Sequence, residues 1–333
     1  MVSILSKLKF TSIIICTPYL FSVIMYYVIV IIQFIKFNSK QSKKLFLKKL
    51  SKKLFIIYIS ICLITNIARL IDENMYIHFV DVGQGDCTFI QTRNNKKILI
   101  DGGGNEIGED YVGENILLPY LLNRRSKVID YIFISHFDSD HCQGLLYIMQ
   151  NIKVKHVIIS KQFEYNENYK KFLKIAKQEK INIKIANKGD KIYIEKNLYF
   201  EVLWPDALEP ISDNKINNNS LVCKMVYKKF SMLFTGDIEK IAEEKIIETY
   251  KLKATIIKIP HHGSKTSSTM DFIEKVKPQE ALIGVGKKNK FGHPAITTIQ
   301  TLQNQNIKIY RTDEMGEITI KTNGKKYKVT KLL

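Results

Sequence analysis

Residues of the types that bind metals are concentrated in one short segment, His136-Phe137-Asp138-Ser139-Asp140-His141. This segment directly follows Tyr131 to Ser135, a β-branched and aromatic run that predicts a buried strand. Solvated loops usually carry such side chains singly, so the spacing predicts metal ligands. Alternate residues of a strand-end loop can converge on one ion while the adjacent Asp140-His141 pair turns to another. The segment therefore predicts two ions side by side.

Three further segments place ionisable side chains after predicted strands. Gly236-Asp237 follows Met232 to Phe234, and the glycine would let the backbone turn so that the carboxylate projects at the sheet edge. Taken alone, Asp237 fits an N-cap of the next helix better, whereas beside the first segment a metal-bridging carboxylate is favoured. The other two segments are His261-His262-Gly263-Ser264 and Gly292-His293-Pro294. The two remaining histidines, His78 and His156, are expected to be packed strand residues.

Composition excludes several classes of protein. The 333 residues are 45% hydrophobic, which argues against disorder. Five cysteines without a Cys-x-x-Cys pair exclude a small disulfide scaffold and a zinc ribbon. The net charge of +19 is unevenly distributed, because residues 1–70 contain no acidic side chain.

Residues 1–70 are predicted to form a membrane anchor. The apolar run 10–35 is long enough to cross a bilayer, and it lacks the short core and cleavage site of a signal peptide. A second apolar run, 54–70, is short for a span, so an interfacial or buried core helix is the alternative. The eight lysines of the intervening loop 36–53 should hold that loop in the cytoplasm. If both runs cross, the body 71–333 is extracytoplasmic.

The body alternates strand-like and helix-like segments. Period-2 or β-branched runs recur between stretches of helical periodicity, such as 167–178 and 296–303. No linker rich in Gly, Pro or Ser divides residues 71–333. We therefore expect one α/β domain with two or more sheets.

In this order, the first segment, Gly236-Asp237 and His261-His262-Gly263-Ser264 resemble the motifs of the metallo-β-lactamase superfamily. That resemblance implies an αββα sandwich with a two-metal site between the sheets. More closely, Asp81-Val82-Gly83-Gln84-Gly85-Asp86 and Ile100-Asp101-Gly102-Gly103 resemble the hydrolase domain of ComEC-type DNA-uptake proteins. The similarity extends over residues 74–333.

The resemblance implies roles for individual residues. His136 and Asp138 would bind the first ion, Asp140 and His141 the second, and Asp237 would bridge them. His262 is favoured as the ligand in its pair, with His261 as a ligand in its place or a proton donor. Asp101 would hold a ligand histidine by a hydrogen bond. The remaining expected substrate or supporting residues are Asp81, Gln84, Asp86, Asn219, Ser264, Lys265 and His293.

Two departures from the family pattern affect the choice of metal. The third motif position, usually His, falls at Asn217-Asn218-Asn219-Ser220, and the usual His-x-His is His136-x-Asp138. Both changes supply oxygen in place of nitrogen, which favours Mn or Mg more than a nitrogen-rich site would. Zinc remains compatible with the ligand set.

The predicted activity is hydrolysis of phosphodiester bonds in DNA, in connection with DNA uptake. Lys265, Lys287, Lys288 and Lys290 could hold successive phosphates, or could form an ordinary solvated face. Two spans cannot form the many-helix channel of the family, so a separate channel protein is an expected partner. The alternatives are hydrolysis of a small or cell-surface ester or lactam, and a non-catalytic component of an uptake complex.

Overall fold

The computed structural model describes residues 14–38, 40–104, 108–249 and 252–331. The chain divides into two compact units. The first, which we call the helical unit, comprises the residues up to Glu73 together with Leu122–Ser126. The second, which we call the body, comprises Asn74–Leu121 and Lys127–Leu333.

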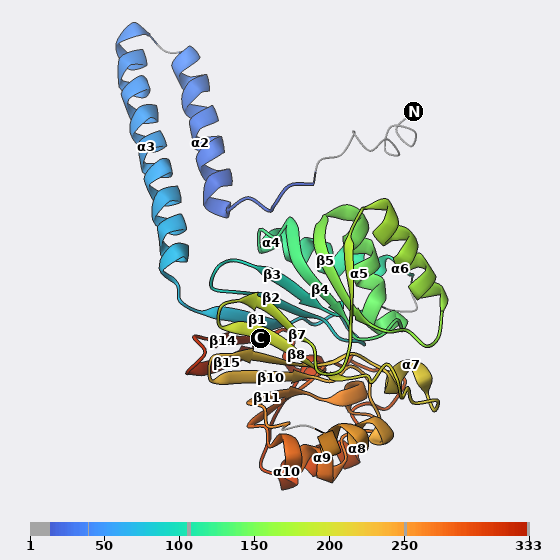
Figure 1. Ribbon diagram of the computed structural model, residues 1–333. Helices are drawn as coiled ribbons and strands as arrows, with labels where there is room; N and C mark the ends of the chain where they lie inside the picture. The colour runs from blue at the N-terminus through green and yellow to red at the C-terminus, as the bar shows by residue number, and fades with distance from the viewer. Residues whose placement is uncertain (1–13, 39, 105–107, 250–251, 332–333) are drawn as a thin grey trace. The chain divides into compact units, whose positions relative to one another are not determined.

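The helical unit contains two helices side by side, α2 (Leu20–Phe37) and α3 (Gln41–Ile71) (Figure 1). The ring of Phe21 stacks on that of Tyr58, with centroids 5.9 Å apart. Residues 10–35 were expected to be one span, but the helix starts only at Leu20 because Pro18 disfavours helical geometry before it. Residues 10–13 of that expectation lie outside the described residues.

The expectation of a lysine-rich loop over 36–53 is wrong. Lys43 to Lys53 lie inside α3, which begins at Gln41, shortly after α2 ends at Phe37. Lysine is a good helix former, and a charged helix face is well solvated, so the charge run does not interrupt the helix. The second apolar run is therefore the later part of a 31-residue helix, which is about 46 Å long at 1.5 Å per residue.

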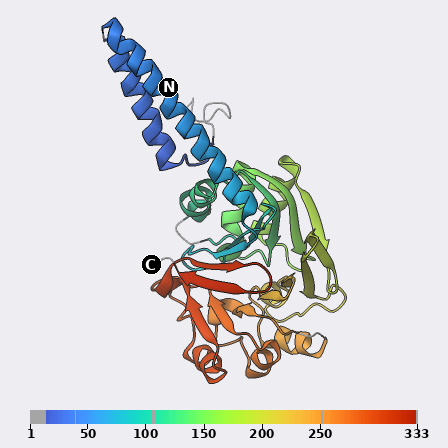
Figure 2. The same ribbon diagram turned by 90° about the vertical axis from the view of Figure 1, so that its left-hand side faces the viewer.

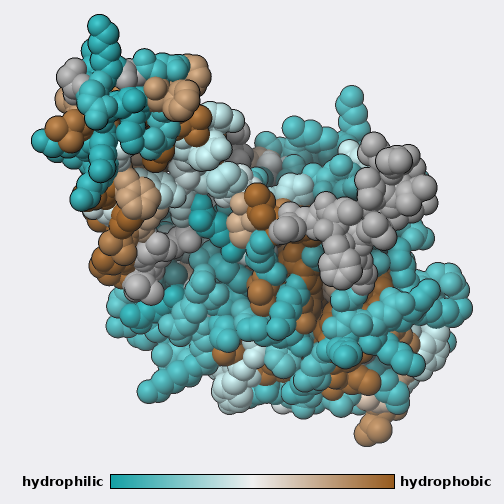
Figure 3. Space-filling model, turned by 90° about the horizontal axis from the view of Figure 1, so that it is seen from above, coloured by the Kyte–Doolittle hydropathy of each residue, from teal (hydrophilic) through white to brown (hydrophobic). Residues whose placement is uncertain are grey.

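Apolar side chains of the helical unit are exposed. Among the described residues, α2 is long and apolar enough to cross a membrane by its length and composition. Leu20 is 76% exposed and Phe34 68% exposed. Figure 3 shows such apolar atoms (brown) on the surface of this unit, beside hydrophilic ones (teal). Several side chains of the expected second span, including Arg69, lie outside the described set.

The body is built on two sheets (Figure 1). The first sheet has eight strands in the order β15-β14-β1-β2-β3-β4-β5-β6, and β3 to β6 are parallel. The second has seven in the order β13-β12-β11-β10-β9-β8-β7, and β10 to β13 are parallel. The strands are β1 Met75–Phe79, β2 Thr88–Gln91, β3 Lys97–Ile100, β4 Val128–Ile134, β5 Lys153–Ser160, β6 Asn182–Ala186, β7 Lys191–Glu195, β8 Leu198–Trp204, β9 Val222–Tyr227, β10 Phe230–Phe234, β11 Ile256–Lys258, β12 Glu280–Ile283, β13 Lys308–Arg311, β14 Ile318–Thr322 and β15 Tyr327–Lys331.

Helices cover the outer face of each sheet, as both ribbon views show (Figure 2). Leu145 of α5 and Phe172 of α6 pack in one buried cluster with Ile132 of β4. Ile246 of α8 and Phe272 of α9 pack in another with Ile257 of β11. The helical segments are a π-helical turn Gly113–Leu117, α4 Leu118–Asn123, α5 Ser139–Asn151, α6 Glu167–Gln178, α7 Lys215–Asn218, α8 Lys240–Thr249, the 3₁₀ turn Pro260–Gly263, α9 Met270–Val276, α10 Ile296–Asn304 and α11 Thr312–Met315.

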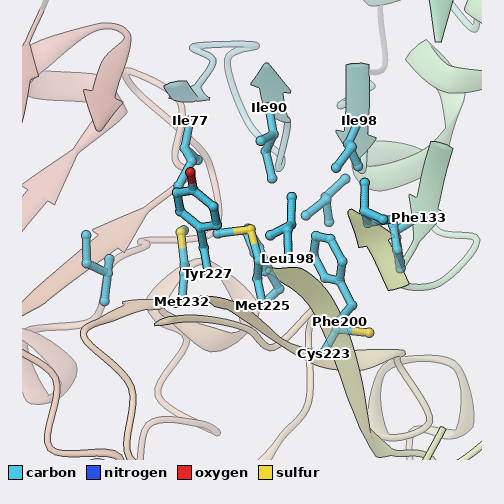
Figure 4. Packing of buried hydrophobic residues seen from close by; sticks show 14 of the residues in the cluster. Ile77, Ile90, Ile98, Phe133, Leu198, Phe200, Cys223, Met225, Tyr227 and Met232 are labelled. Carbon is cyan, nitrogen blue, oxygen red and sulfur yellow. The ribbon is translucent and has the colours of Figure 1, made fainter. Parts of the chain in front are cut away.

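The inner faces of the two sheets share one apolar core. Ile77, Ile90 and Ile98 of the first sheet face Leu198 and residues of neighbouring strands in the second (Figure 4). Across the interface, the rings of Phe133 and Phe200 are in close contact, with centroids 4.4 Å apart, near the lower end of the separations typical of aromatic pairs. The expected two-sheet α/β architecture with helices on the outer faces is confirmed.

Candidate metal centre

The ligand-type residues of the body lie at the carboxyl ends of parallel strands. Asp101 follows β3, His136 follows β4, Asp237 follows β10, His262 follows β11 and Gly284 follows β12. Neighbouring parallel strands end at the same sheet edge, and ligands bind outside such edges in open α/β sheets. The edges of the two sheets at which these parallel strands end therefore bring residues from distant parts of the chain into one site.

A buried group of two aspartates and two histidines marks the centre of this site. In the described part of the chain, Asp86, His141, Asp237 and His262 each offer a ligand atom, and these atoms lie within 4.8 Å of one another. Nε2 of His141 is 3.1 Å from Oδ1 of Asp237, and Nε2 of His262 is 3.3 Å from Oδ2 of the same carboxylate. The two Nε2 atoms are 3.2 Å apart. Imidazole and carboxylate ligands of this kind fit a divalent cation.

The buried histidines are oriented through their Nδ1 atoms. Nδ1 of His141 lies 3.0 Å from Oδ2 of Asp101, and Nδ1 of His262 lies 2.7 Å from the carbonyl oxygen of Gly284. Nδ1 of His136 lies 3.0 Å from the hydroxyl of Ser135. Donation from Nδ1 to a carboxylate or carbonyl leaves Nε2 as the ligand atom, which is the usual arrangement of metal-binding histidines. Nε2 of His136 is buried and has no hydrogen-bond partner among the described residues, so its position also fits a ligand.

The other acidic residues of the first motif border a pocket. Oδ2 of Asp138 lies 3.8 Å from Nε2 of His136, and Oδ2 of Asp140 lies 3.2 Å from Nε2 of His262. Both aspartates line a pocket that is also lined by Asp237, His261, Gln84, Gln143, Asn217, Asn289, Lys290 and Phe291. The deeper cluster therefore opens to a cavity that a substrate could enter.

The electrostatics of the site favour positive charge. Burial alone would lower the pKa of His262, but the charges of Asp237 and Asp86 outweigh it and raise that pKa to about 10. Burial also opposes ionisation of Asp237, yet the charges of His141 and His262 hold its pKa well below the usual value. By contrast, burial, together with the smaller effect of the charge on His141, lowers the pKa of His136 to about 3. Burial, followed by Asp140, raises the pKa of Asp138 to about 6. The carboxylates thus attract protons or cations into the cluster.

The backbone at the second histidine pair is strained. His261 and His262 have φ values of 49° and 53°, a region that costs non-glycine residues about 1 to 3 kcal/mol each. This conformation directs His262 into the buried cluster and leaves His261 at the pocket wall. Nε2 of His261 is 3.9 Å from Oδ2 of Asp237, and its Nδ1 is 3.5 Å from Oε1 of Glu239.

The N-cap alternative for Asp237 is wrong, because α8 begins at Lys240 and the carboxylate of Asp237 contacts histidines of the cluster. The glycine before it has φ of 53°, as expected for a turn at this edge. A Cβ atom at Gly236 would lie 2.7 Å from Cβ of Ser220 and 2.9 Å from Cβ of Ser135. Glycine is therefore required here by conformation and by space.

The loop between β1 and β2 packs against the centre. Oδ1 of Asp81 accepts a hydrogen bond from the Gly83 amide, so this side chain shapes the turn. Gln84 accepts a hydrogen bond from the Gly286 amide and lines the pocket. Asp86 lies in the buried cluster itself. The carboxylate of Asp101 accepts hydrogen bonds from the backbone amide and the hydroxyl of Ser135, and its Oδ2 lies 3.0 Å from Nδ1 of His141.

Asn219, expected among the substrate or supporting residues, is not placed to contact a metal ion or a substrate directly. Its oxygen accepts from the Ile211 amide, and its nitrogen donates to the carbonyl oxygens of Ile211 and Lys215. Both ends of the amide are thus committed to holding a local loop. Ser220 comes nearer the site, with Oγ 3.3 Å from Nδ1 of His136 and accepting from the Asp237 amide.

Three other expected residues lie around the rim or outside the cluster. His293 packs its ring against His261 and His262, with centroids 5.7 and 6.5 Å away. The Ser264 hydroxyl pairs with that of Thr266, 3.0 Å away. Lys265 is exposed.

Sequence reasoning missed Lys258, which is 3% exposed and forms an ion pair with Asp86. A single lysine within the apolar run Thr255 to Ile259 was the available signal, since an unpaired lysine is almost never fully buried. Glu239, which precedes α8 and is half-buried, was also missed, and nothing in the sequence around it marks it.

The comparisons with known proteins agree with the geometry of the site. The family model "Metallo-beta-lactamase superfamily" matches residues 80–287. ComE operon protein 3 of Bacillus subtilis is 34% identical over 254 residues, which cover 73% of this chain and 32% of that protein. Recombination protein 2 of Haemophilus influenzae is 29% identical over 241 residues, which cover 72% of this chain and 28% of that protein. Competence protein ComA of Neisseria gonorrhoeae is 27% identical over 241 residues, which cover 72% of this chain and 31% of that protein.

The chain spans about a third of the length of these curated relatives. The match nevertheless includes every strand-end segment of the centre, from the β1–β2 loop to β12. With the two-sheet fold and the buried Asp/His cluster, it identifies the chain as a member of the metallo-β-lactamase superfamily, in its ComEC-type competence branch.

Proposed function

We propose that this protein is a membrane-tethered hydrolase that uses two divalent ions to cleave phosphodiester bonds of DNA in connection with DNA uptake. The observation that carries the proposal is the orientation of three buried histidines. Each has Nδ1 within hydrogen-bond distance of a carboxylate, carbonyl or hydroxyl oxygen, and each directs Nε2 toward the aspartates of one site. Membership of the competence branch supports DNA as the substrate class.

Each residue would have a distinct task. His136 and Asp138 would hold the first ion, Asp140, His141 and His262 the second, and Asp237 would bridge them. Mn or Zn suits this mixed set, and Mg is compatible with its oxygen atoms. Two such ions, when bound, lower the pKa of water and stabilise the attacking and leaving oxygens of an in-line displacement.

The protein's own groups supply positioning and proton transfer. Asp101 and the Gly284 carbonyl fix two imidazoles, so that the ligand atoms need no rearrangement when a cation binds. His261, at the pocket wall, is the proposed proton donor to the leaving oxygen. Lys290 lines the same pocket and would contact a substrate phosphate.

The membrane tether and its orientation are part of the proposal. The apolar exposed surface of α2 supports insertion. Lysines in the early turns of α3 would stay on the cytoplasmic side, which would put the body outside the cytoplasm. DNA translocation would then require a separate channel protein.

The test uses the full-length chain, stripped of metal with a chelator and supplied with Mn²⁺, Mg²⁺ or Zn²⁺. Linear single-stranded and duplex DNA are incubated with it at two salt concentrations. We expect metal-dependent cleavage that weakens as salt rises and is lost in Asp237→Asn. Asp206→Asn is the matched control, since that aspartate pairs with Lys188 and lies outside the cluster. Intact DNA with every ion, together with cleavage of a small phosphoester, would instead assign the site to a smaller substrate.

A further inference from the structure

Lys258 is a lysine within a buried strand. It ends β11, where all three residues are buried, and its side chain is 3% exposed. Burying an ammonium group carries a large desolvation cost unless charged and hydrogen-bonding partners compensate it. The position therefore requires a compensating set of acceptors.

Those acceptors all belong to the metal centre or to the turn that builds it. Nζ of Lys258 forms an ion pair with Oδ2 of Asp86 and lies 3.2 Å from Oδ1 of Asp237. It also donates to the carbonyl oxygen of Gly236, 2.8 Å away. An ammonium group has three donors, so its hydrogen-bonding capacity is matched by these acceptors.

The lysine shares its acceptors with the cluster that would hold cations. Oδ1 of Asp237, which faces Lys258, is also the atom 3.1 Å from Nε2 of His141. Asp86 offers a ligand atom to the same cluster, yet Oδ2 of its carboxylate is engaged by the ammonium group. The ammonium group of Lys258 thus occupies a position where a metal ion would be attracted by the carboxylates of both Asp86 and Asp237.

Charge balance agrees with this position. Five carboxylates surround the site, those of Asp86, Asp101, Asp138, Asp140 and Asp237. Two divalent ions would match four of these negative charges. The lysine matches the fifth.

We infer that Lys258 is a built-in cation of the metal centre, which keeps Asp86 out of the coordination set and competes with bound ions for Asp237. The inference rests on the proposed function, because it concerns the same metal site. Lys258 is a positioning residue: it acts through the two carboxylates and does not reach the pocket. The inference has a distinctive consequence, namely that removing the lysine charge strengthens metal binding even though it weakens the fold.

The test compares full-length wild type, Lys258→Met, Lys258→Arg and the double variant Lys258→Met/Asp86→Asn. Mn²⁺ binding to each metal-free protein is measured by equilibrium dialysis, and unfolding is followed in denaturant. We expect Lys258→Met to bind Mn²⁺ roughly tenfold more tightly, since a repelling charge within a few ångströms is gone. Lys258→Arg keeps the charge, and the double variant keeps the net charge, so both should stay within about threefold of wild type.

The unfolding measurement distinguishes loss of the Lys258–Asp86 ion pair from nonspecific destabilisation of the fold. Lys258→Met should lower the denaturant midpoint, and the double variant should recover much of that loss, because no uncompensated carboxylate remains. If Lys258→Met does not fold without metal, added Mn²⁺ should restore folding by replacing the ammonium group. Lys224→Met, the same change on β9 of the same sheet, should leave Mn²⁺ affinity unchanged.

Equal or weaker Mn²⁺ binding by Lys258→Met, or failure of Mn²⁺ to restore its folding, would overturn the inference. A double variant that binds as tightly as Lys258→Met would also overturn it. A wild-type chain that binds none of Mn²⁺, Mg²⁺ or Zn²⁺ would overturn the metal site and the inference together. The two failures are therefore distinguishable from the wild-type titration alone.

Discussion

Replacing Asp101 by asparagine should disable His141 as a ligand while preserving the shape of the site. Asp101 accepts hydrogen bonds from the amide and hydroxyl of Ser135, at 2.8 and 2.7 Å, and its Oδ2 lies 3.0 Å from Nδ1 of His141. In Asp101→Asn the single oxygen can keep the amide bond, which turns the NH₂ group toward the imidazole. His141 must then accept at Nδ1 and carry its proton on Nε2, the atom that faces Asp237.

The expected loss follows from that change of tautomer. Removing a partner that orients a ligand histidine typically costs about tenfold to hundredfold in metal affinity, which corresponds to roughly 1.4 to 2.8 kcal/mol. The assay is equilibrium dialysis of Mn²⁺ with the metal-free full-length protein. DNA cleavage at saturating Mn²⁺ is the second readout, and it should also fall.

Asp130→Asn is the matched control for this experiment. Asp130 is also buried and accepts from a backbone amide, that of Lys97, at 2.9 Å, while its other oxygen pairs with Lys155. It belongs to β4 but contacts no residue of the metal cluster. Both variants should lose stability, and Asp101→Asn alone should lose metal affinity. Equal Mn²⁺ affinities in the two variants would refute the idea that Asp101 sets the His141 tautomer.

Three further outcomes are expected. Gly284→Ala should destabilise the fold by about 1 to 3 kcal/mol and weaken Mn²⁺ binding, because the new Cβ would lie 2.4 Å from Oδ1 of Asp86. Denaturant unfolding measures the loss of stability, and equilibrium dialysis measures the loss of Mn²⁺ affinity. Asn219→Ala should cost about 2 to 3 kcal/mol in unfolding free energy through its lost loop hydrogen bonds, with unchanged Mn²⁺ stoichiometry. A changed stoichiometry would contradict a purely structural role for this residue. Burial raises the pKa of Glu243 from 4.5 to about 7, so the folded protein holds that proton more tightly than the unfolded chain. The stability it contributes is present below pH 4.5 and lost as pH rises to about 7, by up to about 3 kcal/mol, and a Glu243→Gln variant with the same pH slope would contradict this.

Much of the fold could be predicted from local patterns. The helical stretch expected at 167–178 coincides with α6, and the stretch expected at 296–303 lies within α10 (Ile296–Asn304). Two strands were missed, β7 (Lys191–Glu195) and β15 (Tyr327–Lys331). Both are edge strands that carry exposed lysines, and these charged residues weaken the β-branched and aromatic signal by which strands were recognised.

The sequence by itself determined which residue types gather at the strand ends. Ligand-type side chains that directly follow β-rich segments, such as His136 and Asp237, must lie at a sheet edge, because the strand fixes the exit point of the chain. Their chemistry and order also carry the family resemblance, which the comparisons confirm.

Only the tertiary structure decided which of these side chains meet. With a left-handed backbone at both residues, His262 lies in the cluster and His261 at the pocket wall. Asn219 is withdrawn into a local loop, and Lys258 is drawn in by Asp86, which precedes it by more than a hundred residues. The Lys258–Asp86 pair depends on how two sheets, formed by distant stretches of chain, approach at one edge. Local sequence periodicity carries no information about that approach.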